Sequence, residues 1–426
     1  MFLQFSVSNF KSIQDIATFS MLSSKNNAEN TFGLKNYKIL DSAVIYGANA
    51  SGKSNIIKAM GFMTMIIQNR VKVIQSIDKL PYEPFRLNTQ SQNMPSAFEI
   101  IFFIDDIKYR YGFELDSEKI YSEWLFEDEK GREAKLFSRD IEQKDYVNPK
   151  RFKEGERFFN KTNSKIEISQ NQLFIWVCDR ENNSIISKKI LEWFNSFNVI
   201  DASRSDSFSQ YAVNKMKDDE SFKNMIIRLV KAADTGIDGI EAEENDVEID
   251  KIPLELRKIV GEDIVKKGYI KRIDINTIHK KYDENKKYVG DEKFELLKDE
   301  SVGTQKFFQI SAPILDTLLN GKILIVDEID ASLHPILVSY LISLFNNKNK
   351  NTKKAQLIFA THDTNLLNSF EREQIWFTQK DKYGATELYS LLEIKNVRDS
   401  QNFEKHYIQG KYGAVPFIGD FKFDNE

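Results

Sequence analysis

Cysteine and histidine are scarce in this sequence, and their scarcity excludes several kinds of site. The 426 residues include one cysteine, Cys178, and four histidines, at positions 279, 334, 362 and 406. One cysteine cannot form a disulfide scaffold or a cysteine-based zinc site within a single chain. The histidines are too scattered to indicate a metal cluster. We interpret His279 and His406 as structural or surface residues, and Cys178, at the end of an apolar run, as a buried core thiol.

Long apolar runs, a large net charge and internal repeats are also missing. No apolar run is long enough to span a bilayer, and residues 1–5 lack the features of a signal peptide, so we expect a cytoplasmic protein. The net charge of −4 gives no global attraction to nucleic acid, so a DNA contact would need a local basic patch. No heptad run suits a long coiled coil. The length predicts two or three subdomains.

Residues 47–54 read Gly-Ala-Asn-Ala-Ser-Gly-Lys-Ser and match G-x-x-x-x-G-K-[ST], the phosphate-binding P-loop. Gly47 and Gly52 allow a tight turn whose N–H groups point at phosphate oxygens. Lys53 can reach the β- and γ-phosphates, and the Ser54 hydroxyl can ligate Mg²⁺. A buried strand over 42–46 enters the loop, and a helix from Lys53 to about Ile77 leaves it. A glycine-rich turn that matched by chance would lack this context.

The first half of the chain contains several predicted strands and helices. Residues 2–9 and 13–21 are typical of strands, and residues 97–126 of a meander with a tight Asp105-Asp106 turn. Residues 127–165 are polar and are expected to be solvated and irregular. Helical spacing predicts helices over 171–178, 185–197 and 221–233. Residues 266–287 form the most basic stretch, which fits either a solvated hairpin or helix face or a nucleic-acid contact.

Two buried strands of the second half end in polar residues. A helix is predicted over 306–319, followed by an apolar strand over 322–326 that ends in Asp327-Glu328. A second buried strand, over 355–360, precedes His362. Polar groups at the carboxyl ends of such strands lie where open α/β sheets place their active sites. Asp327 suits Mg²⁺ and Glu328 suits a general base, although an Asp-Glu pair alone would also fit a helix cap. A further helix is predicted over 336–345, and residues 374–378 and 387–390 are expected to be edge strands.

The order of these motifs resembles the ABC-type ATPase heads of the SMC and RecF kind. More closely, the chain resembles the OLD/RloA-like AAA-family ATPases of prokaryotes, a group tied to phage defence. The resemblance rests on four runs, and it covers residues 1–125 and about 277–418. These runs are Asn9-Phe10-Lys11-Ser12, Glu300-Ser301-Val302-Gly303-Thr304-Gln305, the stretch from Asp327 to Pro335, and the stretch from Tyr407 to Pro416.

The resemblance implies an α/β fold, an ABC-type P-loop ATPase head in which a mixed sheet with helices joins an antiparallel N-terminal meander. A mainly helical region is inserted into this head. The implied division is an N-terminal ATPase lobe over 1–126, an inserted helical or irregular region over 127–293, and a C-terminal lobe over 294–426.

The resemblance also implies a role for each site residue. The catalytic residues would be Glu328, His362 as the switch histidine, and Lys53, and the Mg²⁺ ligands Ser54 and Asp327. ATP would be sandwiched in a head-to-head homodimer or larger homo-oligomer, because the signature segment contacts ATP of the opposite protomer. The expected ATP-binding residues are Gly47, Asn49, Gly52, Lys53, Ser54 and Asn55, the signature residues Ser301, Gly303 and Gln305, and Asp330 of the D-loop.

Some residues of this sequence depart from the family pattern, and some features of the family are missing. Val302 and Thr304 stand where the general ABC signature prefers small residues, and neither Gln90 nor Gln92 can be assigned as a Q-loop glutamine. No nuclease half follows His362, so a nuclease or toxin, for example of the Toprim type, is expected as a separate partner chain.

Three functions remain open at this point. The first is a slow ATPase that acts as the sensor or regulator subunit of an anti-phage defence system. The second is an SMC/RecF-like DNA-repair ATPase, supported by the basic stretch. The third is an ATP-dependent scaffold that sequesters an effector. A membrane-transporter subunit does not fit the N-terminal motif.

Overall fold

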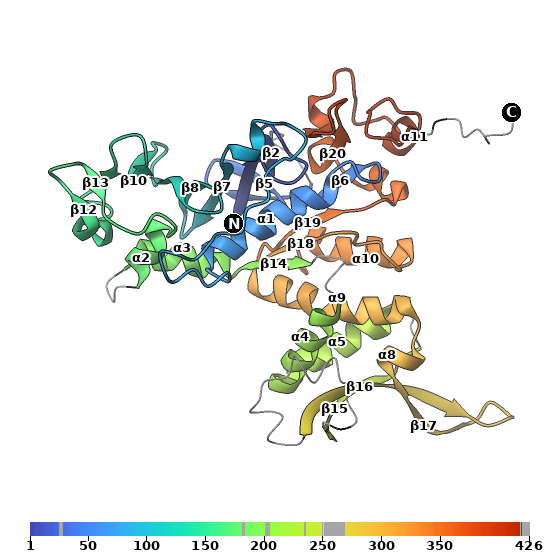
Figure 1. Ribbon diagram of the computed structural model, residues 1–426. Coiled ribbons are helices and arrows are strands. Elements are labelled where there is room, and N and C mark those ends of the chain that lie inside the picture. The colour runs from blue at the N-terminus through green and yellow to red at the C-terminus, as the bar shows by residue number, and fades with distance from the viewer. Residues whose placement is uncertain are drawn as a thin grey trace, which may run out of the picture. The chain divides into compact units, whose positions relative to one another are not determined.

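The computed structural model describes residues 1–24, 29–180, 184–200, 205–233, 236–248, 250, 269–417 and 419 (Figure 1). The chain forms two compact units. The first comprises residues 1–202, 317–331 and 338–426, and the second comprises residues 203–316 and 332–337. Among the described residues, no helix combines the length and the hydropathy that a membrane span requires.

A six-stranded sheet carries the P-loop in the first unit, with the order β14-β18-β19-β6-β20-β21. Strand β6 (Ser42–Gly47) is buried at every position and runs parallel to β19 and β20. Burial on both faces explains the continuous apolar runs in the sequence. The expectation that residues 374–378 form an edge strand is wrong, because β20 pairs with both β6 and β21. The other strands are β14 (Phe197–Ile200), β18 (Ile323–Val326), β19 (Gln356–Ala360), β20 (Ile375–Lys380) and β21 (Thr386–Ser390).

A seven-stranded antiparallel sheet forms a second layer of this unit, with the order β11-β10-β9-β8-β7-β1-β2. The predicted meander of residues 97–126 is confirmed. Its Asp105 and Asp106 have φ values of 49° and 61°, which suit a tight hairpin turn. The strands are β1 (Phe2–Ser8), β2 (Ala17–Ser20), β7 (Ser96–Ile104), β8 (Ile107–Leu115), β9 (Ile120–Asp128), β10 (Ala134–Asp140) and β11 (Tyr146–Val147).

Helix α1 (Lys53–Ile67) packs between these two sheets. Phe62 stacks on Phe98 of β7, with ring centroids 5.0 Å apart. On its other side, Gly61 faces Val199 of β14, where an added Cβ would lie 3.4 Å from a side-chain carbon. The architecture confirms the expected α/β fold, in which a mixed sheet with helices joins an antiparallel N-terminal meander.

Helix α1 is shorter than the sequence pattern predicts, since the apolar spacing suggested a helix to about Ile77. The helix ends because Asn69 adopts a left-handed φ of 49°. The Asn69 and Arg70 nitrogens then donate to the carbonyls of Ile66 and Met65, which is the hydrogen-bond pattern of a Schellman cap.

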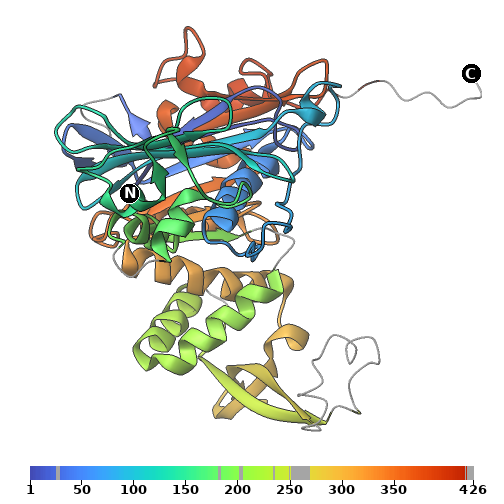
Figure 2. The same ribbon diagram turned by 60° about the vertical axis from the view of Figure 1, so that its left-hand side comes forward.

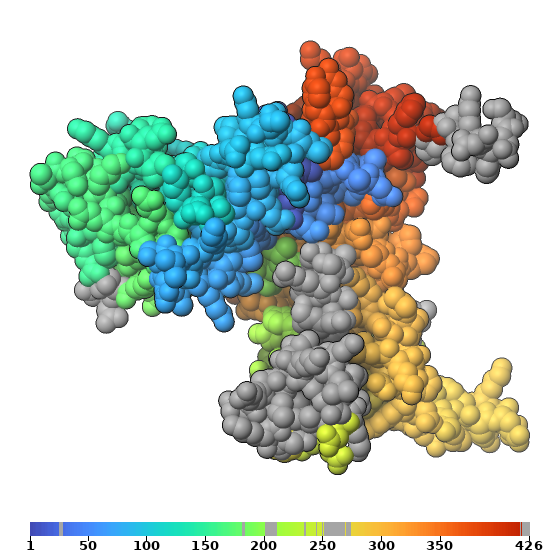
Figure 3. All heavy atoms as spheres, in the orientation of Figure 1, coloured from blue at the N-terminus to red at the C-terminus, as the bar shows by residue number. Residues whose placement is uncertain are grey.

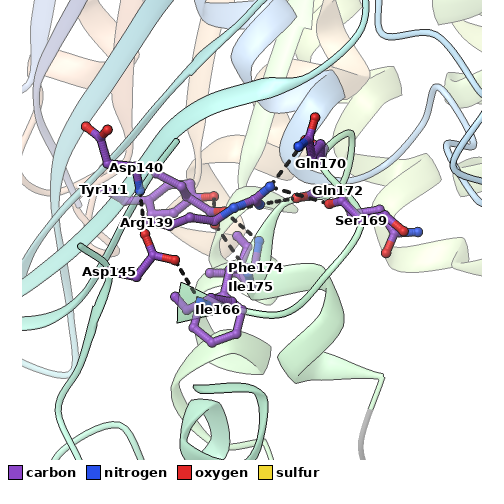
Figure 4. A network of polar contacts seen from close by, with 11 residues as sticks. Tyr111, Arg139, Asp140, Asp145, Ile166, Ser169, Gln170, Gln172, Phe174 and Ile175 are labelled. Carbon is purple, nitrogen blue, oxygen red and sulfur yellow. Dashed lines mark hydrogen bonds and ion pairs between the residues drawn. The ribbon is translucent and has the colours of Figure 1, made fainter. Parts of the chain in front are cut away.

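The expectation that residues 127–165 are solvated and irregular is wrong for strand β10. Its Arg139 is only 6% exposed and donates to the Gln172 carbonyl at 2.6 Å (Figure 4). The guanidinium also lies 3.9 Å from the buried Glu123 carboxylate. Glu123 accepts hydrogen bonds from the Tyr111 hydroxyl at 2.9 Å and from the Phe174 nitrogen at 2.5 Å. This buried polar network fastens α2 (Phe174–Asp179) to the antiparallel sheet.

The closing tyrosine-rich run packs against the P-loop strand. The Tyr407 ring stacks on Phe377 of β20 at a centroid distance of 5.4 Å and lies 5.8 Å from Tyr46 of β6. Tyr412 lies 5.9 Å from Phe377. The run therefore completes the core beside the P-loop.

Cys178 is fully buried, as expected. The remaining elements of the first unit are short or peripheral. Residues 336–345 form a helix as predicted. The elements are β3 (Leu22–Ser23), β4 (Thr31–Leu34), β5 (Tyr37–Leu40), β12 (Phe159–Asn160), β13 (Lys165–Ile166), α3 (Ile186–Phe194), α10 (Pro335–Asn346), α11 (Phe403–Ile408), and the 3₁₀ helices η1 (Ser91–Asn93), η2 (Lys153–Phe158), η5 (Thr364–Ser369), η6 (Arg372–Gln374) and η7 (Leu391–Glu393).

The second unit contains helices and a three-stranded antiparallel sheet. Figure 2 shows α4 and α5 side by side, next to the sheet β15-β16-β17. In the basic stretch, residues 266–268 lie outside the described residues, and the rest forms β16 and the turn that leads into β17. Residues 127–293 thus contain strands as well as helices. The elements are α4 (Ser205–Asp218), α5 (Glu220–Ala232), β15 (Gly239–Glu248), β16 (Tyr269–Tyr282), β17 (Tyr288–Glu295), α8 (Leu296–Asp299) and α9 (Val302–Asn320).

Candidate functional site

Both motif glycines of the P-loop are in close contact with side chains of the sheet. A Cβ on Gly47 would lie 2.5 Å from the Thr378 carbonyl oxygen and 2.5 Å from Ser51 Oγ. Gly52 has a φ of +112°, and a Cβ there would lie 2.2 Å from Thr386 Oγ1. The positions therefore require glycine for packing against β20 and β21, in addition to the tight turn that the sequence predicted.

A chain of hydrogen bonds links the P-loop to the N-terminal motif. Asn55 Nδ2 donates to Ser12 Oγ at 2.6 Å, and Ser12 Oγ lies 2.8 Å from Thr386 Oγ1. Thr386 Oγ1 donates to the Ser51 carbonyl at 2.9 Å. Ser51 Oγ in turn lies 2.6 Å from Thr378 Oγ1. Ser12 thus has a structural role in the Asn-Phe-Lys-Ser motif, and the Asn55 side chain, expected to bind the nucleotide, contacts Ser12.

Thr378 and Thr386 were missed by the sequence reasoning. They lie more than 300 residues from the P-loop, on strands predicted as peripheral, and no motif marks them. Their contact with the loop depends on the pairing of β6 with β20 and of β20 with β21.

Lys53 points its ammonium group back at the loop. Lys53 Nζ donates to the carbonyls of Gly47 at 2.8 Å and Ala48 at 3.1 Å, and the side chain is buried. Burial lowers the pKa of Lys53, and the charges of nearby carboxylates oppose that shift. These carboxylates belong to Asp327, Glu328 and Asp330.

The acidic loop after β18 is held by the strands on both sides. The Asp327 nitrogen donates to the Ile200 carbonyl at 2.9 Å, and the Ile329 nitrogen donates to the Ala360 carbonyl at 3.2 Å. Glu328, between them, has a left-handed φ of 51°. This conformation costs a non-glycine residue about 1–2 kcal/mol. The hydrogen bonds on either side therefore hold Glu328 in this left-handed conformation.

His362 follows β19 and lies beside the acidic loop. Its main-chain nitrogen donates to Asp330 Oδ2 at 3.2 Å. Desolvation, and next the positive charge of Lys53, lower the pKa of His362, while the nearby carboxylates raise it. Lys53, Asp327, Glu328, Asp330 and His362, predicted from separate motifs, thus lie within electrostatic reach of one another in the first unit.

The donors present fit a magnesium nucleotide. Asp327 is 4% exposed at the end of a strand, and Ser54 is half-buried at the start of α1. Carboxylate and hydroxyl oxygens are ligands that Mg²⁺ prefers, and Mg²⁺ commonly takes one or two protein ligands together with phosphates and waters. Within the described ranges, no group of three or more His, Cys, Asp or Glu side chains suits a metal ion. Asn49 is exposed on the loop.

A surface pocket of about 670 Å³ opens next to Ser12 and Asn55. Basic side chains contribute to its wall, namely Lys11, Arg86 and Lys380. Gln92 also lines the pocket and donates to the Arg86 carbonyl at 2.9 Å. The sequence reasoning did not identify this pocket, because its walls come from four segments that are distant in the sequence.

The signature segment, Ser301–Gln305, lies in the second unit and forms the start of α9. Ser301 Oγ accepts a hydrogen bond from the Thr304 nitrogen at 3.1 Å, so Ser301 caps the helix. Gln305 Nε2 donates to the Glu300 carbonyl at 2.9 Å. A Cβ on Gly303 would lie 2.8 Å from the Ser332 carbonyl oxygen. Val302 is 66% exposed, so the segment presents a capped helix start with an outward apolar side chain.

Comparison with known proteins adds family information to this geometry. A family model described as "AAA domain, putative AbiEii toxin, Type IV TA system" matches residues 42–368, well over half of the chain. A solved structure described as the SmcHead bound to the C-winged helix domain of ScpA is 13% identical, with a TM-score of 0.36, and the alignment covers 91% of this chain and 97% of that chain. No curated protein matches the chain.

Proposed function

Because the chain belongs to the family of AAA domains described as putative AbiEii toxins of type IV toxin–antitoxin systems, we propose that it binds ATP with Mg²⁺ and hydrolyses it. The observation that carries this proposal is the convergence of the P-loop lysine, Lys53, with the acidic loop and His362. A P-loop without an acidic partner strand could bind phosphate, whereas hydrolysis also needs groups that act on the metal and on water.

In this proposal, each residue has one task. The N–H groups of the P-loop and the start of α1 bind the phosphates, and Lys53 turns from the loop carbonyls toward the β- and γ-phosphates. Ser54 and Asp327 hold Mg²⁺, which neutralises phosphate charge when bound. The Glu328 carboxylate orients the attacking water and accepts its proton, and His362 donates a hydrogen bond to the γ-phosphate.

We further propose that the active form is a head-to-head homodimer or a larger homo-oligomer. The exposed, capped start of α9 supports this arrangement, because it presents Ser301 and Gly303 to a second copy. In a two-fold dimer each signature segment would complete the ATP site of the partner, so that two complete sites form together.

The biological role that we propose is regulation of a separate effector in an anti-phage defence system of the OLD/RloA-like kind. The family description, which names a toxin of toxin–antitoxin systems, supports this context. Slow hydrolysis suits such a role, because the nucleotide state then acts as a switch. The effector, a nuclease or a toxin, would bind the ATP-loaded assembly.

The DNA-repair alternative receives less support from the hairpin. Three lysines of this hairpin pair with acidic residues, among them Lys281 with Glu292. Lys293 lies 2.6 Å from Glu241, and Lys280 lies 3.4 Å from Asp238. A DNA contact would have to break these pairs, so we do not propose one.

The test uses Glu328→Gln, which keeps the size of the side chain and removes its charge. We expect ATP binding within about threefold of wild type, and a fall in turnover of about a hundredfold or more. Light scattering with and without ATP-Mg²⁺ measures the mass of the same variant, and Lys53→Ala serves as the control that cannot retain nucleotide. Unchanged turnover in Glu328→Gln would remove this residue from catalysis. A monomer with ATP bound would contradict the dimer, and an assembly of constant size would favour the scaffold function.

A further inference from the structure

Glu300 joins the start of the signature helix to the β16–β17 hairpin. Its side chain is 9% exposed. Oε1 accepts hydrogen bonds from Thr277 Oγ1 at 2.5 Å and from His279 Nε2 at 2.6 Å. Thr277 and His279 are two positions apart on β16, so their side chains project from the same face of the strand. The His279 ring also packs against Phe294 of β17, with a centroid distance of 4.7 Å.

The burial of Glu300 makes these two hydrogen bonds structurally important. A nearly buried carboxylate without partners is strongly unfavourable, so donors must be in place to compensate for its burial. Thr277 is fully buried and His279 is held by a ring contact, so both donors have fixed positions. Glu300 is therefore fixed relative to β16.

The same residue also connects directly to the signature segment. Its carbonyl accepts from Gln305 Nε2, and the next residue, Ser301, caps α9. The position of β16 thus determines the direction in which Ser301 and Gly303 are presented.

The β16–β17 hairpin extends away from Glu300 and is called the arm below. Its tip projects outward from the second unit (Figures 1 and 3). Lys293 of β17 pairs with Glu241 at 2.6 Å and Glu243 at 2.8 Å on β15, and Lys281 of β16 pairs with Glu292 of β17. Strand β16 is paired through its backbone with β15 and β17, so a displacement of the arm would reach its base at Thr277 and His279.

We propose that Glu300 is a positioning residue that couples the β16–β17 hairpin to the signature segment. Through Thr277 and His279, it sets whether Ser301–Gln305 can complete the ATP site of a second copy. A partner that displaces the hairpin would therefore control ATP-dependent assembly. This inference rests on the proposed dimer. It adds a positioning role for Glu300 and a regulatory role for the β16–β17 hairpin, and the proposed function requires neither.

The experiment compares ATP-dependent dimerisation of variants made in the Glu328→Gln background. Glu300→Ala removes the coupling. We expect it to weaken dimerisation about tenfold or more, as the loss of hydrogen bonds to a charged group implies. ATP binding by the monomer should stay within about twofold, because the P-loop belongs to the other unit. Glu300→Gln keeps an acceptor oxygen for Thr277 and His279 and should recover most of the assembly. Glu284→Gln is the matched control, an exposed carboxylate in the turn of the hairpin.

A double-mutant cycle separates coupling from general destabilisation. If His279 acts through Glu300, His279→Ala with Glu300→Ala should assemble as Glu300→Ala does alone, since the second change removes nothing further. Additive effects would contradict the proposal. If Glu300→Ala does not fold, Thr277→Val removes one donor while His279 still pairs with the carboxylate, and it should weaken dimerisation about threefold.

Two outcomes have different meanings for the two proposals. If the Glu328→Gln parent dimerises with ATP and the Glu300 and Thr277 variants dimerise equally well, the coupling is wrong and the proposed function stands. If the parent binds ATP but remains a monomer, the proposed dimer fails, and the role of Glu300 fails with it.

Discussion

The main-chain nitrogen of His362 donates to Oδ2 of Asp330 at 3.2 Å, which joins two loops 32 residues apart in the sequence. The other carboxylate oxygen of Asp330 is buried and has no hydrogen-bond partner among the residues that the structure describes. The loop after β18 and the loop after β19 are therefore linked through one carboxylate. A substitution of Asp330 should change the position of His362.

Replacement of Asp330 should impair hydrolysis more than binding. Asp330→Ala removes the acceptor for the His362 nitrogen, so His362 loses its position relative to Glu328. We expect turnover to fall about tenfold to a hundredfold, with the Kd for ATP within about threefold of wild type. Asp330→Asn keeps an acceptor oxygen and should retain more activity. Steady-state turnover and nucleotide titration measure both effects, and wild-type turnover in Asp330→Ala would contradict this role.

The pH dependence of turnover should report on His362. Desolvation, and next Lys53, lower the pKa of His362 below its usual 6.5, so the imidazole is neutral at pH 7. If the neutral ring acts in hydrolysis, turnover stays level as pH falls to 6.5 and declines below that, as the ring takes up a proton. His362→Gln has no titrating ring, so its lower activity should not show this decline. The same acid limb in the glutamine variant would assign the pH dependence to another group.

Asp41, at the entry to β6, should make the protein less stable as pH rises. Burial raises the pKa of Asp41 from 3.8 to about 7, although Lys348 opposes the shift. The folded state thus binds this proton more tightly than the unfolded state, so the contribution is full below pH 4 and is lost as pH rises through 7. The loss is at most about 4 kcal/mol. Asp41→Asn should match wild type in urea unfolding at pH 4 and exceed it at pH 8, whereas Asp15→Asn, at an exposed position, should match wild type at both pH values.

Glu123 should be among the residues most important for the stability of the first unit. Glu123→Ala removes the carboxylate that lies 3.9 Å from the buried Arg139 guanidinium and leaves the Phe174 nitrogen without its acceptor. We expect a loss of about 3–5 kcal/mol in the free energy of unfolding. Glu118→Ala breaks the exposed pair with Lys79 and should cost less than about 1 kcal/mol. Equal urea midpoints for the two variants would show that the buried network contributes little.

Prediction from the sequence succeeded where one element carries the whole signal. The P-loop needs a strand, a loop and a helix within one continuous segment, and β6, residues 47–54 and α1 form that segment. The apolar strand before Asp327 was likewise predictable from the sequence, because a strand buried on both faces must be apolar throughout. The roles assigned to individual site residues stay predictions, although the structure brings Lys53, Asp327, Glu328, Asp330 and His362 together.

Prediction failed where burial or backbone conformation depended on distant partners. The polar strand β10 looked solvated, because nothing in its local sequence shows that Arg139 would find carbonyl acceptors and Glu123. Helix α1 looked longer, because the apolar spacing continues past Asn69, whose left-handed φ ends the helix.

By itself, the sequence determined that the chain has a P-loop motif, an acidic strand end and a histidine just after the next buried strand, because each depends on residues close together in the chain. Only the tertiary structure decided that Thr378 and Thr386 pack against the motif glycines, that Ser12 reaches Asn55, and that His279 and Thr277 hold Glu300. These contacts join segments that local propensity cannot bring together. They form because burying strands in a shared sheet places their side chains within hydrogen-bond distance, where an unpaired polar group would be costly.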